Sequence, residues 1–154
     1  MEIEFTKWIQ FNCINAYNQF GWVPGIYAIA YSEENISGKE FDYISEIVYF
    51  GMTNSKNGLH GRLKQFYDTI YLKRSQHGGA DRFIYNLNKE DINWKEKLYI
   101  STMPYIHCSV STNSPEDLII MGDVAKQEYV CQAEYVKRFK KLPRFNDKKN
   151  SPKK

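Results

Sequence analysis

Two tyrosines on neighbouring apolar segments, and one arginine shortly after them, are the residues of this sequence best suited to chemistry. Tyr27 lies in the run GIYAIAY, Tyr49 lies in SEIVYFGM, and Arg62 follows in GLHGRLKQF. An arginine guanidinium is always charged, and its planar fork matches the oxygens of a phosphate group. A tyrosine phenol has a pKa of about 10, so a nearby cation must stabilise its phenolate before it can act as a base. Together the three residues are suited to chemistry on a phosphate group.

Five short motifs follow one another along the chain. Gly25-Ile26-Tyr27 opens one apolar run, Tyr49-Phe50-Gly51 lies near the end of the next, and Arg62 stands near the start of a predicted helix. The later stretch AEYVKRFKKLPRFN contributes Glu134 on a helix and Asn146 twelve residues after it. In this order the motifs resemble the GIY-YIG nuclease family over about residues 24–146. The last stretch is also similar to the nuclease domain of the bacterial excision-repair incision subunit.

The resemblance implies a metal-dependent endonuclease that hydrolyses DNA phosphodiester bonds. Tyr27 is then the expected general base, and Tyr49 is expected to bond the same water or Tyr27 itself. Arg62 would stabilise charge on the phosphoryl oxygens. Glu134 would supply an oxygen ligand to one Mg²⁺, or Mn²⁺ in its place, with water completing the shell. Asn146 would orient this glutamate or the backbone nearby.

The sequence departs from the family pattern at two points. About twenty residues separate Tyr27 from Tyr49, where relatives have fewer, and the inserted loop is acidic. A hairpin tolerates a longer loop at small entropic cost, so the assignment stands. Relatives carry a histidine or tyrosine four residues after the arginine, but Phe66 stands there and cannot move a proton. Three nearby residues are alternatives for that role, each with a plain surface role as the competing interpretation: His60, Lys64 and Tyr67.

Basic side chains and one glycine-rich loop are the expected DNA contacts. His77 lies in QHGGADR, where two glycines would let the backbone approach a phosphate. Basic side chains add affinity without reading sequence, and the candidates are Lys73, Arg74 and Arg82 beside His60, Lys64 and Tyr67. Residues 137–154 hold nine Lys or Arg and one acid, which suits a polyanion, although a solvated tail is the plainer interpretation of residues 147–154.

Composition limits the remaining possibilities. The chain has 154 residues, of which 42% are hydrophobic, enough for one domain with a core. Three scattered cysteines form no CxxC pair, which argues against a zinc site or a disulfide framework. No apolar run reaches the ~20 residues of a membrane helix, and the mixed, acidic N-terminus is unlike a signal peptide, so the cytoplasm is the expected location.

Two function classes stay open at this point. The first is a stand-alone nuclease of restriction or mobile-element type, monomeric or homodimeric. The second is a nucleic-acid-binding module of the same fold that has lost activity, an alternative supported by Phe66. A third interpretation, a protein-interaction domain, predicts no affinity for DNA.

The elements that would position these residues form a small α+β domain. Alternation and aromatic content predict strands in GIYAIAY, SEIVYFGM and EKLYISTMPY, hence a three-stranded antiparallel sheet flanked by helices. Apolar residues recur at helical spacing over 59–72, and Ser114-Pro115 begins a helix that runs to about residue 140. The first twenty residues are expected to form a further helix. We expect one nuclease domain over 1–146, with its core at about 24–146, and a basic flexible tail over 147–154.

Overall fold

The computed structural model describes residues 3–12, 21–74 and 77–150. Within them, four strands form one antiparallel sheet in the order β1-β4-β2-β3. Their bounds are Ile9–Gln10 for β1, Gly25–Tyr31 for β2, Ile47–Thr53 for β3 and Leu98–Pro104 for β4. The α+β class and the three expected strands are confirmed, but the sheet has four strands rather than three.

The fourth strand, β1, lies where we expected a helix. Ile9 pairs with Ile100 and Gln10 pairs with Tyr99 of β4. Trp8 and Phe11 are both buried, but they belong to different apolar cores of the molecule. An extended segment explains this because side chains an odd number of positions apart point to opposite faces. The part of the expected helix over 13–20 lies outside the described residues.

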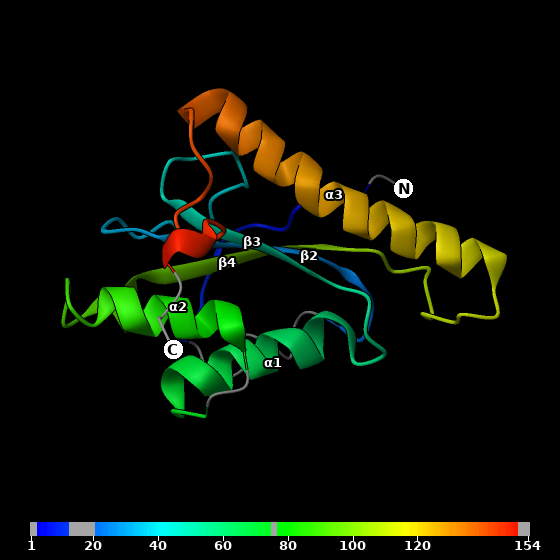
Figure 1. The fold of residues 1–154 in the computed structure, drawn as a ribbon, viewed down its shortest axis with the longest axis horizontal. Coiled ribbons are helices and arrows are strands. Elements are labelled where there is room, and N and C mark those ends of the chain that lie inside the picture. Colours follow the sequence, from blue (N-terminus) through cyan, green and yellow to red (C-terminus); the bar gives the residue numbers. More distant parts are fainter. Residues whose placement is uncertain (1–2, 13–20, 75–76, 151–154) are drawn as a thin grey trace.

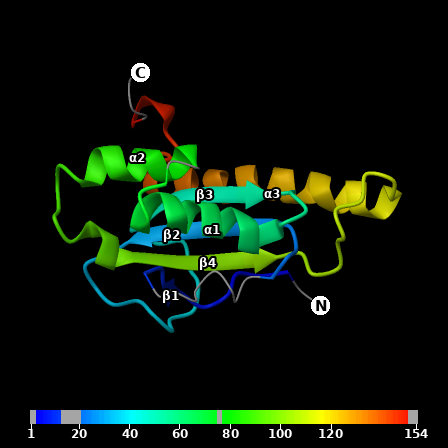
Figure 2. The same cartoon turned by 90° about the horizontal axis from the view of Figure 1, so that it is seen from below.

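In the described part of the chain, three helices cover the sheet. They are α1 at Gly58–Tyr71, α2 at Gly78–Leu87 and α3 at Pro115–Phe139. Figure 1 shows α3 on one side of the sheet and α1 with α2 on the other, and Figure 2 shows the sheet behind α1. Short 3₁₀ turns occupy Trp94–Lys97 (η2) and Lys148–Asn150 (η3). The short segment RFIYNL, which the sequence leaves ambiguous, belongs to α2.

The central strand β2 divides the interior into two cores. Tyr27 and Ile29 face α1 and α2, whereas Ile26 and Ala28 face α3. This alternation follows from the period of two in a strand. Because both faces are covered, nearly every residue of β2 is buried, which accounts for its continuous apolar run.

Helix α3 begins and ends as the sequence predicts. The Ser114 hydroxyl accepts a hydrogen bond from the Asp117 amide, with Pro115 in the first turn. The helix ends at Phe139, and Lys140 adopts a left-handed conformation after it. Its yellow N-terminal part projects beyond the sheet in Figures 1 and 2. Within the described residues, no helix combines the length and the apolar character that a membrane span requires.

Candidate active site

The register of β2 and β3 brings the two motif tyrosines together. Tyr27 lies opposite Gly51, and Ile29 lies opposite Tyr49, so the tyrosines are diagonal neighbours on one face of the sheet. Aromatic side chains reach one another across such a diagonal. The two ring centroids are 6.1 Å apart. The pairing of β2 with β3 therefore brings both tyrosines to one site, despite the long loop between the two strands.

Gly51 makes room for the Tyr27 ring. A Cβ atom built at Gly51 would lie 2.2 Å from Cζ and 2.4 Å from Oη of Tyr27, closer than real Cβ contacts allow. Gly25 is similarly close to its neighbour strand, where a Cβ would lie 2.4 Å from the Met103 carbonyl oxygen. In each triplet, the atoms opposite the glycine thus lie too close for any residue with a Cβ atom.

His77 completes a buried pair with Tyr27. Its Nε2 lies 3.0 Å from the Tyr27 hydroxyl oxygen, and its Nδ1 accepts a hydrogen bond from the Ala80 amide at the start of α2. Burial, with Arg62 and Arg82 nearby, lowers the pKa of His77 to about 3, so the ring is neutral near pH 7. A neutral imidazole has one N–H, and because Nδ1 is an acceptor, Nε2 carries it. His77 therefore donates to the Tyr27 oxygen.

The tyrosine phenols are strongly affected by burial. Burial raises the pKa of Tyr27 well above its usual value, Tyr49 raises it further, and Arg62 opposes both through its charge and hydrogen bonding. Burial also raises the pKa of Tyr49, with Glu128 adding to the rise while Arg82 and Arg62 lower it. Tyr27 is fully buried, at 0% exposure, whereas Tyr49 is only partly buried. Of the two tyrosines, Tyr49 is the more exposed residue.

Arg62 is the common neighbour of these groups. Its charge acts on the pKa values of Tyr27, Tyr49, His77 and Glu128. Its Nε atom is buried and has no hydrogen-bond partner among the described residues. An unsatisfied buried donor costs about 1–3 kcal/mol, which native folds seldom carry without a functional reason. An oxyanion placed beside this guanidinium would satisfy it.

Glu128, which the sequence motifs did not single out, is the carboxylate of α3 that faces this cluster. Burial raises its pKa and Arg62 opposes that rise. Glu134 instead lies near Tyr43 and Cys131, whose pKa values its charge raises. Six residues turn an α-helix by about 240°, so the two glutamates point in different directions. The structure thus places Glu134 near Tyr43 and Cys131, and its expected role beside Tyr27 stays a prediction.

Asn146 binds backbone rather than a carboxylate. Its Oδ1 accepts from the Phe50 amide at 2.8 Å, and its Nδ2 donates to the Phe50 carbonyl oxygen at 2.8 Å. Beside it, the Phe145 amide donates to the Val48 carbonyl oxygen at 2.8 Å. These bonds occupy the outer edge of β3 on either side of Tyr49. Of the two roles expected for Asn146, the structure has the one on the backbone.

Phe66, which stands where the sequence motif led us to expect His or Tyr, packs against His77. Phe66 is fully buried, and its ring centroid is 4.6 Å from that of the imidazole. The histidine that packs against it thus comes from a different part of the chain, the segment before α2. Tyr67, another candidate for that role, is buried against Phe11 and Tyr71.

The other expected DNA contacts lie at varied distances from the cluster. Arg82 affects the pKa values of Tyr49 and His77, and it donates to the Phe145 carbonyl oxygen at 3.1 Å. Lys64 forms an ion pair with Asp68 at 2.7 Å. His60 stacks on the exposed Trp22 at 4.3 Å between ring centroids. Lys73 and Arg74 are exposed beyond the end of α1.

The residues present fit a metal ion held by one carboxylate. Among the described residues, no group of three or more His, Cys, Asp or Glu side chains could hold a metal. Mg²⁺ commonly binds one or two carboxylates and keeps several waters, so a single glutamate suffices. Glu128 is such a carboxylate, half-buried beside the Arg62 charge.

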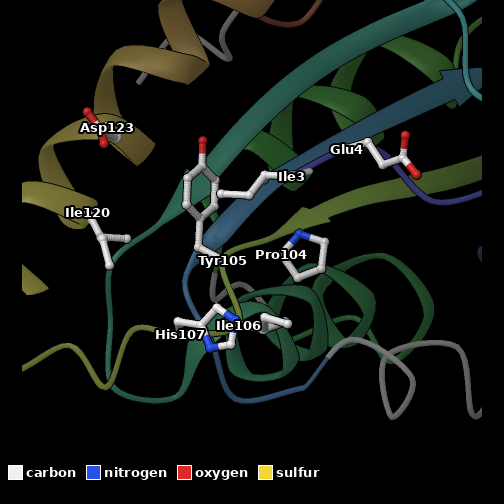
Figure 3. A pocket seen from close by; sticks show the side chains of 8 residues that line it. All are labelled: Ile3, Glu4, Pro104, Tyr105, Ile106, His107, Ile120 and Asp123. Carbon is white, nitrogen blue, oxygen red and sulfur yellow. The ribbon is translucent and has the colours of Figure 1, made fainter. Parts of the chain in front are cut away.

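A separate pocket of about 270 Å³ lies on the α3 side of the sheet. Figure 3 shows the Tyr105 ring in it, between Ile3 of the N-terminal segment and Ile120 of α3. None of the described residues that line it is Lys or Arg, and Glu4 and Asp123 stand at its rim. It is therefore unsuited to a phosphate.

Comparisons of the chain with protein-family models, with curated proteins and with solved structures found no match. The site is thus described by its own geometry: two tyrosines, a histidine, an arginine and a glutamate brought together from β2, β3, α1, α3 and the segment before α2.

Proposed function

We propose that this chain is a metal-dependent endonuclease of the GIY-YIG type that hydrolyses DNA phosphodiester bonds. The observation that carries the proposal is Arg62. Its Nε–H is buried and unsatisfied among the described residues, and its charge reaches both motif tyrosines, His77 and Glu128. Phosphoryl transfer depends mainly on positioning and on charge stabilisation at the phosphoryl oxygens. A guanidinium in this environment is suited to that task.

In this proposal the two tyrosines have different roles. The resemblance assigns the general base to Tyr27, but its full burial and its bond from His77 favour a positioning role. Tyr49 is partly exposed beside it, so we assign to Tyr49 the contact with the attacking water. In this scheme Tyr27 stands beside Tyr49, while His77 holds Tyr27 in place. Arg62 favours the phenolate of either tyrosine.

Glu128 takes the role that the motif gave to Glu134. A divalent cation bound there would neutralise charge on the phosphoryl oxygens and on the leaving 3′ oxygen. Glu128 itself gains from such a cation, because burial disfavours its charged form. Mg²⁺, or Mn²⁺ in its place, has the preference for oxygen ligands that this residue offers.

A plasmid-nicking assay tests the proposal. Supercoiled DNA should be nicked with Mg²⁺ and left intact with EDTA, and Tyr49→Phe should reduce the rate more than Tyr27→Phe. Because the Tyr49 pKa is raised, the wild-type rate should increase by up to about tenfold per pH unit between about pH 7 and 9. A rate for Tyr49→Phe equal to wild type, with Tyr27→Phe inactive, would return the base role to Tyr27.

A second candidate is a nucleic-acid-binding module without activity. The full burial of Tyr27, together with Phe66 in place of a proton-moving residue, favours it. The two functions separate in one pair of measurements. Binding of the plasmid in a gel-shift assay without any Mg²⁺-dependent nicking would support the module, and Mg²⁺-dependent nicking that Arg62→Ala abolishes would support the nuclease.

A further inference from the structure

The pocket beside Tyr105 differs in charge from four other cavities of the described structure. Its wall has no described lysine or arginine, although the chain carries 21 of them. The four other cavities, of about 170–440 Å³, each have at least one lysine in their walls. Glu4 and Asp123 stand at the rim of the Tyr105 pocket, and neither forms an ion pair with a described lysine or arginine. The pocket therefore presents negative charge to a ligand that enters it.

Most of the remaining wall is apolar. Ile3, Pro104, Ile106 and Ile120 line the pocket together with the Tyr105 ring, as Figure 3 shows. Ile3 and Ile106 are each about half exposed, so a ligand seated here would remove apolar surface from water. The volume of about 270 Å³ is slightly below the ~300–1,000 Å³ of pockets that hold drug-sized ligands. The pocket is therefore suited to a small ligand with an apolar body.

The Tyr105 hydroxyl lacks a strong hydrogen-bond partner. Tyr105 is only 8% exposed, and its hydroxyl donates to the Met103 sulfur at 4.0 Å, a weak acceptor at a long distance. A buried tyrosine hydroxyl usually has a better partner. Burial raises the pKa of Tyr105 and the Asp123 charge raises it further, so this carboxylate lies near the phenol. Figure 3 shows the hydroxyl directed away from His107. The phenol oxygen and the carboxylate are both acceptors, which a ligand with several N–H donors would satisfy.

We propose that this pocket binds a small aromatic amine. Its ammonium group lies between the Tyr105 hydroxyl and the Asp123 carboxylate, and its ring packs on the isoleucines. An ammonium brings three N–H donors, and its hydrogen bond to a carboxylate is stronger than one between neutral groups. The Tyr105 ring adds attraction for a cation near its face. Tyr105 belongs to the core on the α3 side of the sheet and Tyr27 to the other core, so this site is separate from the candidate active site.

Titration of the full chain, followed by the NMR shifts of its backbone amides, tests the site without DNA or metal. Three probes share an indole ring and an ethylene linker: tryptamine ends in an ammonium, tryptophol in a hydroxyl and indole-3-propionate in a carboxylate. Tryptamine should bind with a dissociation constant between about 10 μM and 1 mM, as its size allows. It should shift the amides of Tyr105, Ile106 and Ile120 most. Tryptophol should bind at least about tenfold more weakly, and indole-3-propionate should cause no shifts there, because it meets Glu4 and Asp123 with like charge.

Variants of the pocket test which groups hold the ammonium. Asp123→Asn, at an exposed position, should weaken tryptamine binding at least about tenfold and leave tryptophol binding unchanged. Tyr105→Phe should weaken tryptamine binding severalfold. Glu96→Gln, at an exposed carboxylate beyond the other end of β4, is the matched control and should bind tryptamine as the wild type does.

Four results would each overturn the proposal. They are no tryptamine-dependent shifts up to about 10 mM, tryptophol binding as tight as tryptamine binding, equal tryptamine affinity of Asp123→Asn and Glu96→Gln, and shifts centred outside the pocket. None of these measurements depends on nuclease activity, so the amine site stands or falls separately from the proposed function.

Discussion

His77 Nε2 lies 3.0 Å from the Tyr27 hydroxyl oxygen, although the two residues are fifty positions apart in the chain. The Ala80 amide occupies the other imidazole nitrogen and thereby sets the direction of this hydrogen bond. A histidine so arranged cannot accept a proton from Tyr27 through Nε2. It holds the phenol and stabilises its charged form, in a cluster that Arg62 and Glu128 complete.

Arg62 is expected to serve function at some cost to stability. Arg62→Met should reduce nicking by at least about two orders of magnitude, because charge stabilisation at the phosphoryl oxygens is lost. Its melting temperature should stay the same or rise, because the buried unsatisfied Nε disappears. Arg62→Lys should not restore nicking, since lysine lacks the planar fork. Lys39→Met, at an exposed lysine of the loop between β2 and β3, is the control and should leave nicking unchanged.

The two glutamates of α3 provide a matched pair of variants. Glu128→Gln should remove Mg²⁺-dependent nicking, whereas Glu134→Gln should leave it near wild type. Metal binding can also be measured without catalysis. Mg²⁺ should raise the melting temperature of the wild type and of Glu134→Gln, because bound ligand stabilises the folded state, but not that of Glu128→Gln. The reverse pattern would return the metal site to Glu134.

His77 should make the protein less stable as the pH falls. Its pKa is about 3 in the folded protein against an ordinary value of 6.5, so below pH 6.5 the unfolded chain binds a proton that the folded chain does not. The free energy of unfolding should therefore fall by up to about 1.4 kcal/mol per pH unit as the pH drops from 6.5 towards 3.

His77→Gln removes this titrating group and provides the comparison. The difference in unfolding free energy between wild type and His77→Gln, measured with urea at a series of pH values, should shrink as the pH falls. Other groups titrate alike in both proteins, so their effects cancel in this difference. A difference that stays constant from pH 7 to pH 4 would mean that His77 titrates normally.

Asn146 is expected to act through the edge of β3. Asn146→Ala leaves the Phe50 amide and carbonyl without their side-chain partners, and it should cost about 1–3 kcal/mol in urea unfolding. Nicking should fall only in part, since the side-chain hydrogen bonds of Asn146 go to the Phe50 backbone. Asn113→Ala, in an exposed turn, is the control and should change stability little. Full loss of nicking with unchanged stability would assign Asn146 to the chemistry instead.

The local patterns of the sequence were sufficient to predict most of the elements. Apolar, aromatic runs marked β2 and β3, alternation marked β4, and Ser114-Pro115 marked the start of α3, because strand patterns and helix capping depend on neighbouring residues alone. The two triplets placed both motif tyrosines on paired strands, and Arg62 followed on the predicted helix. Burial of both sheet faces also follows from the continuous apolar run of β2.

Tertiary packing decided what no local pattern carries. The pairing of His77 with Tyr27 joins distant parts of the chain, and the two-residue β1 forms only because β4 offers it an edge. The choice between Glu128 and Glu134 depends on how α3 is rotated about its axis. Because α3 is apolar on its inner and its outer face, its periodicity does not say which side meets the sheet. Only the packing of Val124 and Tyr135 against the sheet sets that rotation, and so turns Glu128 towards Arg62.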